Sequence, residues 1–377
     1  EARAIALATA EKAAILLKNE GPLLPLDPSE LRTIAVIGPN ADETILGGYS
    51  DVPKQTVSLL DGVRAYVSAH QGDKTEVRFS PGVRITEERN WFGDDVKLID
   101  PQANRTMIAE AVEVAKEADV VILAVGDNEQ TSREAWAESH LGDRSSLELV
   151  GEQEDLVRAI VETGTPTVVV LIHGRPLAVN SIAESVPAII DGWYLGQETG
   201  TALARILFGD VNPGGKLPVT IPRSVGQLPM FYNHKPTARR GYLFGTTEPL
   251  WPFGYGLSYT TFAFENLTLG RSEMGIDDSA TVSVDVVNTG DRAGDEVVQL
   301  YIRDVVSSVT RPVKELKGFE RVTLAPGERK TVTFTVGPEQ LRFYNRSMER
   351  VVEPGAFTLM VGSSSVDHES ITLTVVP

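Results

Sequence analysis

A dense group of polar side chains lies between residues 126 and 144, directly after the apolar run Val120 to Val125. General acid/base chemistry needs a carboxyl group that can release and recover a proton, and the acids of this group include Glu134, Glu129 and Asp127. An apolar neighbour raises the pKa of a carboxyl group and a cation lowers it, and both kinds of neighbour are present. The segment therefore predicts a general acid/base site.

Other side chains near these acids could line the same site. Trp136 and His140 lie within the segment and Trp91 precedes it. For His140, a role at the site and a packing role stay equally open. Asp143 and Arg144 end the segment. For these two we predict a structural role, in which Asp143 caps the following turn and Arg144 pairs with acids.

His173 lies at the end of another apolar run, within the motif IHGRP. A catalytic base is one interpretation, and a structural histidine before a turn is the one that we favour. The chain has no cysteine, which excludes thiolate metal sites and cysteine nucleophiles. It also has no GxSxG, GxGxxG, P-loop or HExxH motif, and no ligand cluster predicts a metal or a cofactor.

Strands and helices alternate through the first part of the chain and must position these residues. Continuous apolar runs predict the strands, and periodic stretches predict the helices. Strands are predicted within residues 33–42 and at 77–82, 120–125, 165–172 and 187–191, with helices at 5–18, 58–69, 107–118, 152–162 and 200–208. This alternation predicts a mostly parallel α/β sheet with helices on both faces. Ligands bind such sheets beyond the carboxyl ends of the strands, where the polar segment begins.

The composition and periodicity of the sequence change twice after residue 209. A Gly- and Pro-rich stretch comes first, followed by an aromatic and glycine-rich stretch from Arg239 to Phe262. About seven evenly spaced short strands then fit an immunoglobulin-like or fibronectin type III-like sandwich. We therefore expect a helical lead-in at residues 1–22, an α/β sandwich domain at 23–225, a connector at 226–262 and the β-sandwich at 263–377.

Composition narrows the classes of partner. The 377 residues include 35 Lys and Arg against 52 Asp and Glu, a net charge of −17, which disfavours nucleic acid and anionic membranes. No apolar run approaches the roughly 18 residues of a membrane span. The first residues read as an Ala-rich helix rather than a signal peptide, and a chain that begins in mid-helix without Met resembles a piece of a longer protein.

Several motifs in a fixed order resemble glycoside hydrolase family 3. They are IAVIGPNAD, GGYS, the acid-rich segment ending in GDRSSLEL, IHGRP, GGKLPVTIPRSVGQLP and PLWPFGYGLSYTTF. The tail after Phe262 is similar to the fibronectin type III-like domain of β-glucosidases and β-xylosidases in that family. The resemblance implies a retaining mechanism, with an Asp nucleophile on an N-terminal (β/α)₈ barrel and the acid/base on the loop after the strand. This chain has neither the barrel nor a Ser-Asp-Trp motif.

The resemblance also ranks the three carboxyl groups. Some members of the family carry Gly-Glu directly after the strand, where this chain has Gly126 and the shorter Asp127. Others place the acid in a Glu-Ala-Glu-like stretch before Asp-Arg, which the residues around Glu134 resemble. We therefore expect Glu134 to be the acid/base, with Glu129 second and Asp127 third. In the site that the resemblance implies, Trp136, His140 and Trp91 are expected to line the subsites near the leaving group.

The expected function is that of the C-terminal half of an exo-acting β-glycosidase, a β-glucosidase in the first instance, that is inactive without its barrel. The alternatives are β-xylosidase or β-N-acetylglucosaminidase specificity and a non-catalytic carbohydrate-binding module. The expected partners are an oligosaccharide or β-glucoside and the barrel half, with a homodimer left open and no cofactor, nucleic acid or membrane. The missing cysteine and the acidic composition favour a periplasmic or secreted location, with a cytoplasmic one as the alternative.

Overall fold

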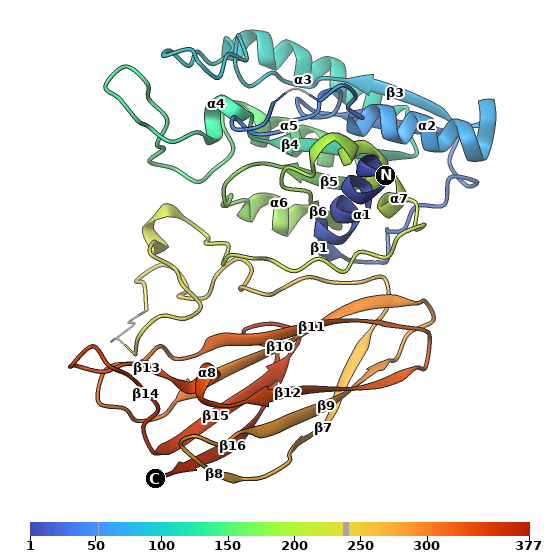
Figure 1. Cartoon of the computed structure of the whole chain (residues 1–377). Helices are drawn as coiled ribbons and strands as arrows, with labels where there is room; N and C mark the ends of the chain where they lie inside the picture. The colour runs from blue at the N-terminus through green and yellow to red at the C-terminus, as the bar shows by residue number, and fades with distance from the viewer. Residues whose placement is uncertain (52, 237–240) are drawn as a thin grey trace. The chain divides into compact units, whose positions relative to one another are not determined.

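The computed structural model describes residues 1–51, 53–236 and 241–377 and divides into two compact units. The first unit is Glu1–Gly215 with Pro222–Gly226, and the second is Lys216–Ile221 with Gln227–Pro377. The first contains a six-stranded sheet with helices and the second is built on β-sheets, which confirms the predicted fold class (Figure 1). The domain limits predicted from the sequence remain a proposal. Arg239 and Arg240, which begin the predicted aromatic stretch, lie outside the described residues.

Strands and helices alternate along most of the first unit. Its elements are α1 (Ala2–Ala13), β1 (Ile15–Asn19), β2 (Thr33–Ile37), α2 (Leu59–Gln71), β3 (Glu76–Ser80), α3 (Pro101–Lys116), β4 (Val120–Gly126), α4 (Glu129–Ser132), α5 (Gln153–Val161), β5 (Thr167–Ile172), α6 (Asn180–Ser185), β6 (Ala188–Asp191) and α7 (Thr199–Leu207). The strand order is β1-β6-β5-β4-β2-β3, with β1 antiparallel to β6 and the other neighbours parallel.

Burial explains why the central strands are continuous apolar runs. Every residue of β4 and β5 is buried, as expected where helices cover both faces of a parallel sheet. The helices form two groups: α2 packs against α7 and α7 against α1, whereas α3 packs against α5. Helix α2 connects β2 to its neighbour β3, and α3 leads from β3 back to β4 on the other side of β2. Because connections between parallel strands are right-handed, these two opposite steps place α2 and α3 on opposite faces of the sheet. In the part of the chain that is described, no helix is long and apolar enough to cross a membrane.

The helix predicted at residues 5–18 is wrong in its second half. Helix α1 ends at Ala13, Ala14 is extended, and the next five residues form β1 at the edge of the sheet. The run from Ala14 to Leu17 is fully buried, and a short buried apolar run has no periodicity that separates a strand from a helix. Pairing with the open edge of β6 decides the outcome, from Ile15 opposite Asp191 to Asn19 opposite Ala188.

The second unit is built on two packed, mostly antiparallel sheets, with β13 and β14 forming a separate two-stranded sheet. Its elements are β7 (Phe262–Leu269), β8 (Glu273–Gly275), β9 (Ala280–Asn288), β10 (Gly294–Asp304), β11 (Glu315–Leu324), β12 (Arg329–Val336), α8 (Pro338–Leu341), β13 (Phe343–Tyr344), β14 (Arg350–Val351), β15 (Gly355–Gly362) and β16 (His368–Val376). The sheets have the orders β11-β10-β15-β16-β8 and β12-β9-β7, with only β8 parallel to its neighbour among these described strands. Alternating Val282, Val284 and Val286 of β9 face a core shared with the other sheet.

Two features fix the carboxyl edge of the first sheet. Gly126 ends β4 with a φ of 154°, and a Cβ there would lie 1.8 Å from the carbonyl oxygen of Ile172. Beyond β5, buried His173 places Nε2 3.0 Å from Oδ1 of Asp191 and Nδ1 2.6 Å from the carbonyl oxygen of Arg175. Burial opposes a charged imidazole, but the Asp191 carboxylate and these hydrogen bonds raise the pKa of His173 overall. These contacts fit the structural role that we favour for this histidine.

Replacing Gly126 with alanine should destabilise the first unit by about 3 kcal/mol or more, because backbone strain and a main-chain collision add. The matched control is Gly164→Ala, where φ is also positive, at 79°, but nothing lies within 4 Å of the added Cβ. It should cost only about 1 kcal/mol. Urea denaturation of both variants measures the difference, and equal losses would show that the contact with Ile172 relaxes without cost.

The His173–Asp191 pair should make stability depend on pH. Because the pKa of His173 is higher in the folded chain than the roughly 6.5 of an unfolded histidine, its stabilisation is fully present below about pH 6.5. That stabilisation is lost as the pH rises through the folded pKa. The free energy of unfolding should therefore differ most between the wild type and His173→Gln at acidic pH. A difference between the two proteins that stays constant with pH would contradict this assignment.

Candidate active site

Residues 127–144, here called the acid loop, begin at the carboxyl end of β4. The buried side chain of Gln153 fixes this starting point, because its Oε1 accepts from the amide of Gly126 and its Nε2 donates to the carbonyl oxygen of Gly126, both at 2.9 Å. The amide of Asp127 then donates to Ile172 at 3.0 Å, which continues the pairing with β5 by one residue. The acid loop therefore starts from a rigid base.

Asp127 is completely buried and ties the beginning of the acid loop to its end. Its Oδ1 accepts from Nη1 of Arg144 at 2.9 Å and from the hydroxyl of Thr131 at 3.0 Å. Its Oδ2 is buried without a hydrogen bond from the described residues. Burial raises the pKa of Asp127, and the Arg144 guanidinium opposes that rise without cancelling it. Burial in turn lowers the pKa of Arg144. A carboxyl group with no exposed surface has no route to a substrate.

Glu129 also forms an ion pair, with Arg89 in the loop between β3 and α3. It is the first residue of α4, which Asn128 caps by accepting from the amides of Gln130 and Thr131. Both carboxylate oxygens of Glu129 lie 2.8–2.9 Å from Nη2 of Arg89. The carboxylate is thus held by a guanidinium from the loop between β3 and α3.

Arg133 anchors the acid loop directly before Glu134. Arg133 is only 2% exposed, yet within the described residues its guanidinium contacts no carboxylate. Instead it donates to four main-chain carbonyl oxygens, those of Leu141, Trp91, Gly93 and Asp94, at 2.7–3.1 Å. One buried guanidinium therefore joins the two sides of the acid loop and fastens both to the loop of residues 91–94.

Glu134 is the exposed carboxyl group that follows this anchor. Within residues 1–51, 53–236 and 241–377, its side chain makes no hydrogen bond or ion pair. Its main chain packs against Gly142, where a Cβ would come within 2.5–2.7 Å of atoms of Glu134 and Ala135. Asp143, predicted to cap the following turn, instead accepts from the amide of Ala135 at 3.2 Å. The carboxyl group of Glu134 is free, whereas its backbone is held.

Aromatic rings from three loops lie in a row beside the acid loop. The ring of Trp136 is 4.9 Å from that of His140, His140 is 6.4 Å from Trp91, and Trp91 is 5.4 Å from Tyr49. His140 is buried, at 3% exposure, and packs between its neighbours, whereas Trp136 is 75% and Tyr49 94% exposed. Trp91 lies against Gly48, where a Cβ would meet its ring at 2.1 Å. The exposed faces of this row could stack on a sugar.

The sheet order matches a nucleotide-binding fold, but the chemistry does not. The parallel strands run in the flavodoxin-like order, with the crevice expected between β2 and β4. Buried Asn40 fills that position, because its Nδ2 donates to the carbonyl oxygens of Asp127 and Ile172, both at 3.0 Å. Among residues 1–51, 53–236 and 241–377, no group of three or more His, Asp or Glu side chains could hold a metal ion.

Sequence reasoning found the acid loop and missed the residues that organise it. Arg133, Arg89 and Tyr49 received no role, although Arg133 stands among the acids and Tyr49 lies in the GGYS motif. A lone arginine in an acidic segment is ordinarily solvated, and no feature of the sequence shows that this one is buried. The structure brings Trp136, His140 and Trp91 together. It also distinguishes the three candidate carboxyl groups: Asp127 is buried, Glu129 is paired with Arg89 and Glu134 is free.

Family comparisons cover both units of the chain. Residues 14–259 match the glycosyl hydrolase family 3 C-terminal domain, and residues 296–365 match the fibronectin type III-like domain. Among solved structures, a β-glucosidase from Erythrobacter marinus superposes with a TM-score of 0.95 at 46% identity, over 99% of this chain and 50% of that one. A β-glucosidase from Listeria innocua in complex with glucose gives 0.85 at 34% identity, over 100% and 50%.

Curated relatives carry two specificities. A β-xylosidase from Formosa agariphila is 44% identical over all of this chain and 50% of its own length. A periplasmic β-glucosidase from Salmonella typhimurium is 42% identical over 94% of this chain and 48% of its own length. The chain thus spans about half the length of the relatives that it matches. It belongs to glycoside hydrolase family 3, as the C-terminal domain of that family followed by a fibronectin type III-like domain.

Proposed function

We propose that the chain supplies the general acid/base of a retaining, exo-acting β-glycosidase whose nucleophile lies on a separate (β/α)₈ barrel half. The observation that carries the proposal is the state of Glu134, which is exposed and unpaired on a loop whose backbone is fixed by Arg133. A proton-transferring group must reach a substrate from a defined position, because misplacement by 1 Å can cost about 100-fold in rate. Buried Asp127 and paired Glu129 meet this requirement less well than Glu134.

The proposed chemistry uses Glu134 twice. As an acid, it donates its proton to the glycosidic oxygen while an aspartate of the barrel attacks the anomeric carbon and forms a glycosyl-enzyme. As a base, the resulting carboxylate then takes a proton from the water that releases the sugar. Trp136 and Trp91 are proposed to stack on the leaving group, with Tyr49 extending their row. Asp143 and Arg144 are proposed to hold the loop.

The names of the relatives support the choice of substrate and location. Solved relatives at 34–46% identity are named β-glucosidases, which favours glucose, whereas the β-xylosidase from Formosa agariphila keeps xylose as the second candidate. The residues that bind the terminal sugar are proposed to lie on the barrel, so this half does not determine whether glucose or xylose is accepted. The Salmonella relative named periplasmic supports a periplasmic or secreted location.

A chimera tests the role of Glu134. The second half of the Erythrobacter marinus β-glucosidase is replaced by this chain, and hydrolysis of an unactivated β-glucoside is measured. Glu134→Gln should lower kcat by about 10²–10⁴-fold, because the leaving oxygen loses its proton donor. An aryl β-glucoside with a very acidic phenol should still be cleaved in the first step, because that leaving group needs no proton.

The control for this experiment is Glu138→Gln, a second exposed acid of the same loop, which should leave kcat unchanged. Full activity of Glu134→Gln together with an inactive Glu129→Gln would move the assignment to Glu129. An inactive wild-type chimera that is folded would favour the alternative, a non-catalytic carbohydrate-binding module.

The chain by itself should hydrolyse neither aryl β-glucosides nor aryl β-xylosides, because one carboxyl group cannot run a two-carboxylate mechanism. Addition of a purified barrel half should restore turnover that saturates with barrel concentration. Turnover by the chain alone that Glu134→Gln abolishes would show that this chain contains its own nucleophile and would contradict the two-half account.

A further inference from the structure

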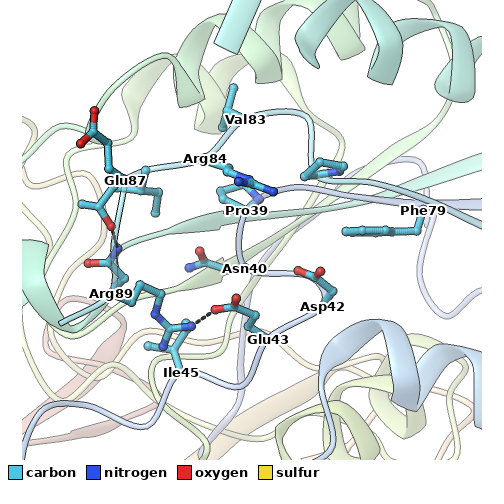
Figure 2. Close-up of a pocket in the computed structure, with 14 residues that line it drawn as sticks. Pro39, Asn40, Asp42, Glu43, Ile45, Phe79, Val83, Arg84, Glu87 and Arg89 are labelled. Carbon is cyan, nitrogen blue, oxygen red and sulfur yellow. Dashed lines mark hydrogen bonds and ion pairs between the residues drawn. The ribbon is translucent and has the colours of Figure 1, made fainter. Parts of the chain in front are cut away.

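A polar cavity of about 420 Å³ lies at the carboxyl ends of β2 and β3 (Figure 2). Its volume falls within the roughly 300–1,000 Å³ of typical small-molecule sites. The loop after β2 forms one wall with Asn40, Asp42 and Glu43. The loop after β3 forms the other, with Arg84, Glu87 and Arg89, and Asn128 closes the end nearest the acid loop.

Some charged groups of the cavity have no internal partner. The guanidinium of Arg84 and the carboxylates of Asp42 and Glu87 make no hydrogen bond or ion pair within the described residues, although all three line the cavity (Figure 2). They offer donors and acceptors in one small space. Apolar side chains complete the wall, among them half-buried Phe79 and buried Val83 and Ile45. Such a mixture binds molecules with both hydroxyl groups and a C–H face.

Other groups of the cavity are fixed in place. Glu43 pairs with Arg89, whose Nη2 also holds Glu129 at 2.8–2.9 Å (Figure 2). Asn40 is locked onto main-chain oxygens, and Nδ2 of Asn128 donates to Thr86 at 2.9 Å. A preformed wall loses little conformational freedom when a ligand binds.

The charges of the cavity favour a neutral ligand. Three carboxylates, of Asp42, Glu43 and Glu87, stand against the two guanidinium groups of Arg84 and Arg89. A phosphate would meet the carboxylates at short range, and the first amides of α4 are already capped by Asn128. A neutral polyhydroxylated molecule can accept from Arg84 and donate to the carboxylates without burying a net charge.

We propose that this cavity is a binding site for a neutral monosaccharide. The choice of a sugar among neutral polyols rests on the proposed function, whereas the binding itself does not. Arg89 links the site to the acid loop, because it contacts Glu43 in the cavity wall and Glu129 at the start of α4. Helix α4 ends at Ser132, two residues before Glu134, so Arg89 connects the wall of the sugar site to the segment that is proposed to carry the acid/base.

Isothermal titration calorimetry of the isolated chain with D-glucose and D-xylose tests the site. The wild type should bind one sugar per chain with a Kd on the order of 1 mM, as expected for so small a polar ligand. Arg84→Ala and Asp42→Asn should each weaken binding by about tenfold or more. Both residues are exposed, and thermal melts of the variants check that they fold. Exposed Arg64→Ala in α2 is the matched control and should bind like the wild type.

Three results would overturn the proposal. The first is no heat of binding at sugar concentrations far above 1 mM. The second is unchanged binding by Arg84→Ala and Asp42→Asn, or its loss in Trp136→Ala, which would place the sugar elsewhere. The third is inorganic phosphate that competes with glucose, which would identify an anion site. No barrel is needed, so failure here is distinguishable from failure of the proposed function.

Discussion

The ion pair between fully buried Asp127 and partly buried Arg144 is the interaction on which the candidate site depends. It joins the first and last residues of the acid loop at 2.9 Å, across 17 positions of sequence. Placing two charges out of water costs free energy, and the pair recovers it only while both partners stay together. Removing one partner of such a pair typically costs about 3–5 kcal/mol. Asp127 is thus a carboxyl group used to close a loop, which leaves the chemistry to another.

Arg133 fixes the part of the acid loop that the Asp127–Arg144 ion pair does not reach. The ion pair fixes the ends of the acid loop. Three carbonyl contacts of Arg133 fix its middle against residues 91–94, and a fourth, to Leu141, ties it to the other side of the loop. Glu134 follows immediately, so its backbone is placed by buried contacts while its carboxyl group remains free. The acid loop therefore holds the backbone of one exposed carboxyl group in place through buried contacts, as the proposed function requires.

Much of the fold could be predicted from the sequence because strands that are buried on both faces consist of unbroken apolar runs. Strands β4 and β5 are buried on both faces, and their unbroken β-branched runs show this. The run from Ala14 to Leu17 was misassigned because pairing with β6, more than 160 residues away, decides its structure.

The candidate site was less predictable because its side chains look alike in sequence. Asp127, Glu129 and Glu134 differ through distant partners: Arg144 for the first, Arg89 for the second and, in the part of the chain that is described, none for the third. Arg89 lies 40 positions from Glu129, on a loop without regular structure. The family resemblance located the loop, and only the fold distinguishes a structural carboxyl group from a free one.

The most direct test of this account is the distance between two carboxyl groups. A crystal structure of the chimera with a bound substrate analogue would give the separation between the carboxyl group of Glu134 and that of the nucleophilic aspartate on the barrel. The account predicts about 5–5.5 Å, the separation in retaining glycosidases. A Glu134 carboxyl group beyond the roughly 9.5 Å limit of inverting enzymes, with Glu129 or another acid facing the nucleophile instead, would contradict it.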